Sequence, residues 1–170
     1  MFKIRKSIFE TNSSSVHAIC IDSAPVDARG LTVHLRIGEF GWEHEWYRDI
    51  DSRASYIYTA ACYIYDKDFY KRFKEMLEPY GIEVECYGED RARFSNWGSN
   101  EYYLDNGYID HGEELREFVD RCLDDADFLI RFIFGENSFV MTTNDNYDYE
   151  DYERDTEVEA GNNELIWKGN

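Results

Sequence analysis

Short stretches of the chain alternate apolar and polar residues, which is the pattern of a strand that buries one face. Residues 31–37 form the clearest such run, with the apolar positions 31, 33, 35 and 37 expected to face inward, and residues 16–22 are also expected to form a strand. In residues 16–22 the two faces are His17, Ile19 and Ile21 on one side and Val16, Ala18 and Cys20 on the other. Further strands are expected at 2–9, 82–86, 138–142 and 164–167.

Other stretches repeat apolar residues every three or four positions, which predicts helices. Asp51 or Ser52 is expected to cap the first of these helices, and Pro79 with Gly81 to end the second. The expected helices are 51–65, 68–78, 113–122 and 127–134.

The order of these elements favours an α+β fold: a mainly antiparallel sheet with three to four helices packed on one face. The pair Asn106-Gly107 predicts a tight β-hairpin within the chain. A length of 170 residues and a mass of 20.2 kDa predict a single domain, 1–170, large enough to bury a core.

The net charge of the chain limits the kinds of partner that it can bind. The chain has a net charge of −18, so it repels nucleic acid and anionic membranes, and direct nucleic-acid binding is not expected. A charged partner would have to be basic.

The four cysteines form no C-x-x-C pair, and neither a signal peptide nor a long apolar run appears, which favours the cytoplasm and no membrane association. The sequence does not indicate an oligomeric state.

The acidic segment 147–160 has a pattern of its own. From Asp151 onward, acidic residues occupy every second position. In an extended chain they would line one face about 6.6 Å apart, since a strand rises about 3.3 Å per residue. Such a row resembles a line of phosphates. The simpler interpretation is an edge strand whose charges prevent pairing with other chains, or a partly disordered loop. The candidate partner-binding residues are Asp148, Asp151, Glu153, Asp155, Glu157 and Glu159.

A polar, turn-forming stretch precedes the first buried strand. Its amide and hydroxyl groups suit either a tight turn or the binding of an anion. This candidate ligand loop consists of Asn12, Ser13, Ser14 and Ser15. No G-x-S-x-G motif accompanies the serines, so a serine nucleophile is not favoured.

Four further polar residues interrupt the periodic patterns: His17, Asp110, His111 and Asp145. If the fold brings them together, they form a mixed nitrogen and oxygen set suited to a divalent metal, or a small catalytic site. The alternative is that the Asp-His pair caps the helix that follows it and that Asn144-Asp145-Asn146 forms a turn. Without that convergence no cofactor is expected.

Five motifs occur in a fixed order: ETNSSSVH, EFGW, ASYIYTA, YIDH and TNDN. Together with the start K-I-R-x-x-I-F-E-T-N-S-S-S-x-H, they resemble an uncharacterised family of small proteins from phages and mobile elements of Firmicutes. The resemblance spans roughly residues 1–146 and departs at Gly112-Glu113, where relatives are expected to continue with Gln-Ser. It implies a phage-like setting in a bacterial cytoplasm, where small acidic proteins often disarm host defences.

Two function classes follow. The first is a non-enzymatic, phage-type protein that binds and inhibits a basic, nucleic-acid-handling host complex, such as a CRISPR effector, by mimicking nucleic acid. The second is a small metal-dependent enzyme or ligand-binding protein that acts on a nucleotide or phosphoester. The charge of the whole chain favours the first class, because a net −18 repels anionic substrates.

Overall fold

A four-stranded antiparallel sheet forms the centre of the computed structural model, which describes residues 15–96, 102–144 and 148–168. β1 (His17–Ile21) lies between β9 (Phe139–Thr142) and β10 (Glu164–Lys168), and β4 (Glu45–Tyr47) pairs with the other side of β9. All five residues of β1 are buried. A strand covered on both faces must be apolar on both, as the HAICI sequence of β1 largely is.

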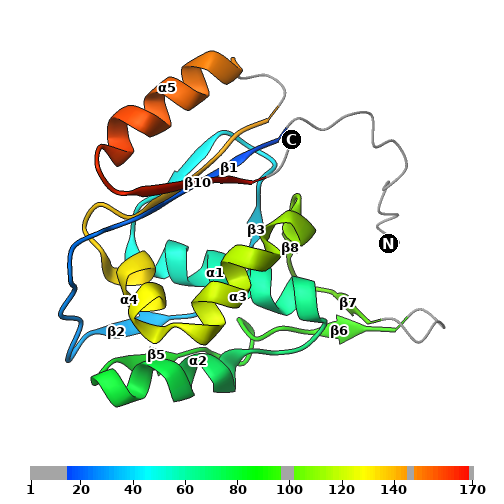
Figure 1. Ribbon diagram of the computed structural model, residues 1–170. Coiled ribbons are helices and arrows are strands. Elements are labelled where there is room, and N and C mark those ends of the chain that lie inside the picture. Colours follow the sequence, from blue (N-terminus) through cyan, green and yellow to red (C-terminus); the bar gives the residue numbers. More distant parts are fainter. Residues whose placement is uncertain (1–14, 97–101, 145–147, 169–170) are drawn as a thin grey trace.

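Helices cover both faces of this sheet (Figure 1). α1, α3 and α4 pack on the face that carries Ile19, Ile21 and Val140, and α5 packs on the opposite face. The helices are α1 (Ile50–Tyr65), α2 (Tyr70–Leu77), α3 (Arg116–Asp124), α4 (Ala126–Phe134) and α5 (Tyr149–Ala160), with short 3-10 turns η1 (Glu78–Tyr80) and η2 (Gly112–Leu115).

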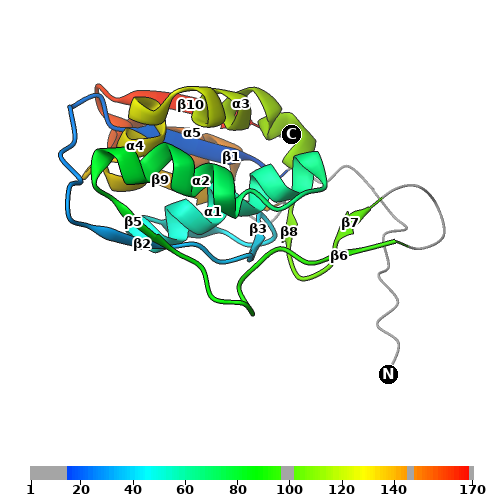
Figure 2. The ribbon, with the colours of Figure 1, turned by 90° about the horizontal axis from the view of Figure 1, so that it is seen from below.

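Three small strand pairs surround the helical layer (Figure 2). Two of them are parallel, and the third, which extends away from the helices in both views, is antiparallel. The pairs are β2 (Thr32–His34) with β5 (Glu83–Glu85), β3 (Glu39–Phe40) with β8 (Tyr108–Ile109), and β6 (Phe94–Ser95) with β7 (Tyr103–Leu104).

The α+β class with a mainly antiparallel sheet is confirmed, as are the two faces of β1, while α5 adds a helix on the face opposite the other helices. One face contributes to the large core under α1, α3 and α4, and Val16, Ala18 and Cys20 form a second core with α5. Leu31, expected inside, is 42 % exposed, because regular pairing with β5 begins only at the next residue. The strand expected at 2–9 lies outside the described residues.

Two local predictions were wrong. The N-cap of α1 is Asp49, whose carboxylate accepts from the Ser52 N–H at 2.8 Å. Asn106-Gly107 does not join a two-stranded hairpin, because β7 pairs with β6 and β8 pairs with β3. The Asn106 side chain instead bonds to the backbone of Arg91 and Arg93, which fixes the turn against that loop.

The acidic segment is helical and not an edge strand, contrary to the prediction. α5 has Asp148 as its N-cap, with the carboxylate accepting from the Glu150 N–H at 2.9 Å. Its buried side chains, Tyr152, Thr156 and Ala160, are four residues apart and so lie on one helical face. Burial of this stripe against the sheet overrides the alternation of the acidic residues, which only marks the solvent side.

Candidate functional site

The structure brings together four of the polar residues singled out from the sequence: Ser15, His17, Asp110 and His111. Ser15 and His17 lie at the start of β1, and Asp110 follows β8. The Asp110 N–H donates to the Phe40 carbonyl at 2.9 Å, which continues the β3–β8 pairing and holds the carboxylate near β1. The Ser15 hydroxyl donates to Asp110, although the two residues are 95 positions apart in the sequence.

Asp110 is the hub of this cluster. Its second oxygen accepts a hydrogen bond from the Tyr108 hydroxyl at 3.1 Å, and His111 Nε2 lies 3.9 Å from the oxygen that Ser15 contacts. His111 adopts a left-handed backbone conformation with φ of 48°. This conformation is uncommon for a residue other than glycine, and it places the ring beside the carboxylate as the chain enters η2.

His17 lies beneath this hub and is completely buried. Its Nδ1 is 2.8 Å from the hydroxyl of Tyr56, which is also buried. Burial raises the pKa of Tyr56 well above its usual value, so its hydroxyl stays protonated and can either donate to Nδ1 or accept from it. The contact is compatible with either neutral tautomer of His17.

The neutral form of His17 is strongly favoured. Burial lowers its pKa from the usual 6.5 to about 4; the negative charge of Asp110 opposes the shift and His111 adds to it. Nε2 has no hydrogen-bond partner of standard geometry among the described residues, although a contact between the ring and the Asp110 backbone favours the protonated ring. A buried ring nitrogen in this position suits a ligand atom or an ordered water.

Gly41 makes the close packing of this site feasible. Its φ of 99° is a conformation that glycine adopts readily. A Cβ at this position would lie 2.7 Å from Asp110 Cβ and 3.0 Å from His17 Nε2. The next residue, Trp42, is 57 % exposed and stacks on Tyr108 with ring centroids 5.2 Å apart, so an exposed aromatic surface borders the cluster.

The remaining predicted residues of this site, Asn12, Ser13, Ser14 and Asp145, lie outside the described residues. Within residues 15–96, 102–144 and 148–168, no group of three or more His, Cys, Asp or Glu side chains is arranged to hold a metal ion. In the same ranges, none of the helices has the length and apolar character needed to cross a membrane.

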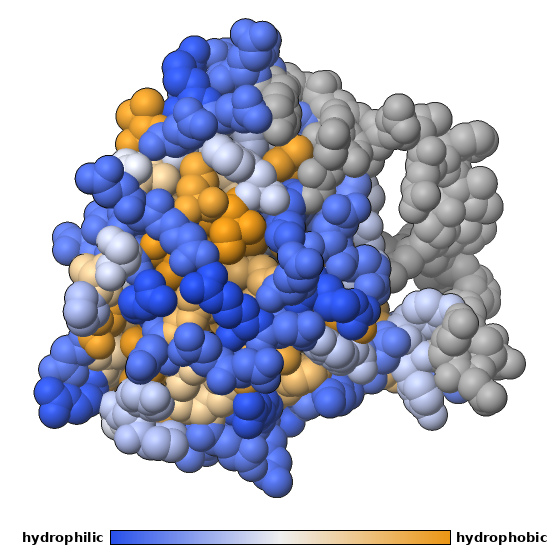
Figure 3. Space-filling view, in the orientation of Figure 1, coloured by the Kyte–Doolittle hydropathy of each residue, from blue (hydrophilic) through white to orange (hydrophobic). Residues whose placement is uncertain are grey.

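Five of the six acidic candidates, together with Glu150, which was not predicted, form a second feature on the outer side of α5; the sixth candidate, Asp148, is its N-cap. An α-helix has 3.6 residues per turn, so the carboxylates form two rows, one on either side of Arg154 and Val158. One row is Asp151, Asp155 and Glu159, and the other is Glu150, Glu153 and Glu157. Figure 3 shows that the surface over α5, at the top of the view, is mostly hydrophilic.

The two rows differ in how far their charge is neutralised. Arg154 pairs with Asp151 and Asp155, and Arg48 pairs with Glu159 at 3.1 Å. No described cation pairs with the row formed by Glu150, Glu153 and Glu157. Exposed ion pairs contribute little to stability, so both rows remain available to a competing basic partner.

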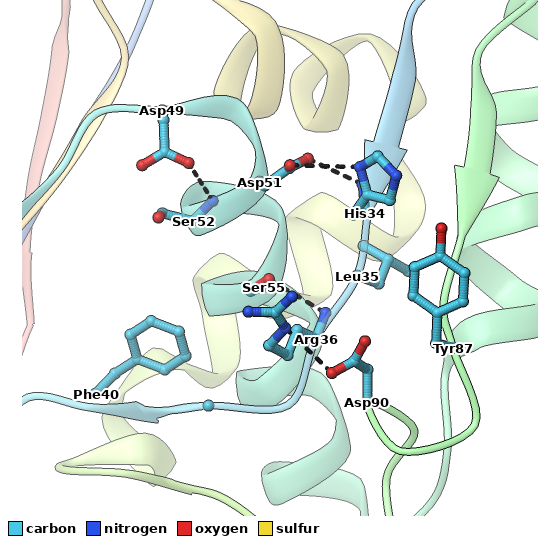
Figure 4. Close-up of a pocket in the computed structure, with 11 residues that line it drawn as sticks. His34, Leu35, Arg36, Phe40, Asp49, Asp51, Ser52, Ser55, Tyr87 and Asp90 are labelled. Atoms are coloured by element: carbon cyan, nitrogen blue, oxygen red, sulfur yellow. Dashed lines mark hydrogen bonds and ion pairs between the residues drawn. The ribbon is translucent and has the colours of Figure 1, made fainter.

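A cavity of about 550 Å³ beside the start of α1 was not predicted (Figure 4). Helix N-termini usually attract anions, but Asp49 caps this one and Asp51 occupies its first turn. Asp90, which pairs with Arg36 at 3.1 Å, adds a third carboxylate to the lining. The cavity is therefore poorly suited to a phosphate group. Sequence patterns missed it because β2, α1 and the loop at residue 90 supply its walls separately.

Comparison with models of protein families, with curated proteins and with solved structures finds no match to this chain.

Proposed function

We propose that the protein binds and inhibits a basic, nucleic-acid-handling host complex, in the manner of an anti-CRISPR or other anti-defence protein of a phage. α5 would occupy a cationic groove that otherwise holds nucleic acid. The observation that carries this proposal is the outer side of α5, where two rows of carboxylates flank one arginine. The net charge of −18 and the family resemblance support it.

The geometry of α5 suits a partial mimic of a nucleic-acid backbone. Residues three or four apart in a helix are separated by about 4.5–6 Å along its axis, so neighbouring charges within each row lie at that spacing. The helix of 12 residues is about 18 Å long, and DNA carries about ten charges over that length. α5 with its N-cap has seven acidic residues, so it supplies more than half of that charge before its ion pairs are counted.

Binding of this kind should depend strongly on salt. When α5 enters a cationic groove, the salt ions held near the carboxylates and near the groove are released into solution. Affinity should therefore fall steeply as the salt concentration rises. The backbone that presents the charges is fixed, because the Tyr152 hydroxyl is bonded to the Val16 and Met141 carbonyls in the sheet. The charged surface is thus preorganised, which lowers the entropic cost of binding.

The first test is capture of partners from lysates of a host that carries defence systems, at low and at high salt. The wild-type protein is expected to retain a basic nucleic-acid-binding protein at low salt and to lose it at high salt. The triple variant Glu150→Gln, Glu153→Gln, Glu157→Gln should retain at least about tenfold less of it. A matched control, Glu89→Gln, Glu114→Gln, Glu136→Gln, removes the same charge from exposed positions outside α5 and should bind like wild type.

Equal loss in the two triple variants would show that bulk charge, and not α5, makes the contact. Capture of no basic partner at any salt concentration would contradict the proposal.

The second candidate function is a ligand-binding or metal-dependent site around His17, Asp110 and His111. The observation that favours it is the buried His17 Nε2 without a hydrogen-bond partner of standard geometry among the described residues. A divalent metal would bind Nε2 in the neutral tautomer whose proton is on Nδ1, where it would donate to the Tyr56 hydroxyl. Metal analysis of the captured preparation distinguishes the two candidates, because a stoichiometric metal that His17→Ala removes would favour this second function.

A further inference from the structure

β10 is an edge strand with a partly exposed apolar centre. It pairs with β1 on one side, and no strand among the described residues pairs with its other side. Its three central residues are Leu165, Ile166 and Trp167; the first two are half-buried and Trp167 is 37 % exposed. Figure 3 shows hydrophobic residues reaching the surface at the level where β10 runs in Figure 1. Edge strands of this kind readily accept another strand.

The charges at the two ends of β10 make it complementary to itself. In an antiparallel arrangement centred on Ile166, Glu164 lies opposite Lys168 of a second copy, and Lys168 lies opposite Glu164 of that copy. Leu165 lies opposite Trp167 of the second copy, which is a favourable aliphatic and aromatic pair. A parallel arrangement in register would place like charges together.

The two faces of the strand agree with this register. Leu165 packs on the α5 side, where Trp167 Nε1 also donates to Thr156 at 3.3 Å. Ile166 packs on the other side, where Glu164 pairs with Arg121 and Lys168 with Glu117 of α3. Residues directly opposite in an antiparallel pair share a face, so every proposed contact joins side chains on the same side of the sheet.

We infer that β10 pairs antiparallel with β10 of a second copy, so that the two four-stranded sheets form one continuous sheet in a two-fold symmetric dimer. The two-fold axis runs between the two copies of Ile166, perpendicular to the sheet. Both copies of α5 then lie on the same face, which makes one extended acidic surface. The inference rests on β10 alone and does not depend on the identity of any host partner.

Repulsion between two chains of net charge −18 opposes this association at low salt. The dimer is therefore expected to strengthen as salt rises, since screening acts on the many long-range repulsions more than on contacts within the strand pair. This direction is opposite to that expected for the basic host partner.

Sedimentation velocity over a concentration series tests the inference with the full chain. Wild type should pass from the 20.2 kDa monomer to a dimer as concentration rises. Glu164→Lys sets like charges opposite one another at both ends of the strand pair and should weaken self-association about tenfold. The double variant Glu164→Lys, Lys168→Glu exchanges the charges and should restore it. Thermal unfolding of each variant verifies that the fold is retained.

A cysteine at the centre of the strand tests the register. Opposite Cα atoms in an antiparallel pair are about 4.5–5.5 Å apart, within reach of a disulfide. Ile166→Cys should therefore form a disulfide-linked dimer under mild oxidation. Glu164→Cys is the matched control and should not, because its counterpart lies at the far end of the pair. A monomer at all concentrations would overturn the inference, as would a dimer that neither Glu164→Lys weakens nor Ile166→Cys links.

Discussion

Replacing Arg53 by alanine is expected to lower the free energy of unfolding by about 3–5 kcal/mol. Arg53 is only 3 % exposed, and its guanidinium donates three hydrogen bonds to backbone carbonyls. Two of them reach Ile133 O in the last turn of α4, at 3.1 and 2.7 Å, and the third reaches Ser138 just before β9. The negative end of the α4 dipole stabilises the cation there.

Truncation would leave both carbonyls buried without donors and would open a cavity between α1, α4 and β9. Burial lowers the pKa of Arg53 to about 10, so the side chain remains charged at neutral pH. Urea unfolding measures the effect. The control is Arg29→Ala, which removes an exposed arginine paired with Asp27 and should cost less than about 0.5 kcal/mol. Equal effects of the two substitutions would contradict this role of Arg53.

The buried His17 is expected to make the protein less stable as pH falls from about 6.5 to about 4. Its folded pKa of about 4 lies below the value of about 6.5 expected in the unfolded chain. Between these values the unfolded state binds a proton that the folded state does not, so acid favours unfolding. The difference of about 2.5 pKa values corresponds to about 3 kcal/mol, fully lost below pH 4.

Urea unfolding at a series of pH values compares wild type with His17→Gln. The variant is expected to be less stable at pH 7, because His17 is well packed, but its stability should depend less on pH in this range. Carboxylates that titrate near pH 4 affect both proteins, so the difference between the two curves isolates His17. If the free energy of unfolding depends on pH in the same way in both proteins, His17 does not stay neutral in the folded state.

The sequence predicted β1 and the residues of its two faces correctly, and the structure adds that both faces are buried. His17 interrupts one of those faces and marks the site. The meeting of His17 with Asp110 had no local signal. It depends on the parallel pairing of β3 with β8, two-residue strands whose partners are far apart in the chain.

In the acidic segment the alternation of charge predicts a strand, whereas the spacing of its apolar and small residues indicates the helix that forms. Tyr152, Thr156 and Ala160 recur every four residues, and Asp148 is a good N-cap, so the signals for α5 were present. The cavity beside α1 had no comparable signal, since its acidic lining residues also serve as a helix cap and as partners of His34 and Arg36.

The fold also explains how a helix with so many like charges can be stable. The buried stripe of α5 packs on Val16, Ala18, Cys20, Phe139 and Met141, and this apolar contact offsets the repulsion along the outer side. The charge of α5 is therefore held on a rigid sheet. A functional role for that surface would give a reason for a charge pattern that stability alone does not favour.

The most direct test of the central claim is competition between the protein and nucleic acid for the captured host partner. Fluorescence anisotropy of a labelled oligonucleotide bound to that partner should fall as wild-type protein is added, because α5 and the phosphate backbone would share one groove. The variant Glu150→Gln, Glu153→Gln, Glu157→Gln should require at least about tenfold more protein for the same displacement. A stable ternary complex, with the oligonucleotide still bound, would contradict nucleic-acid mimicry by α5.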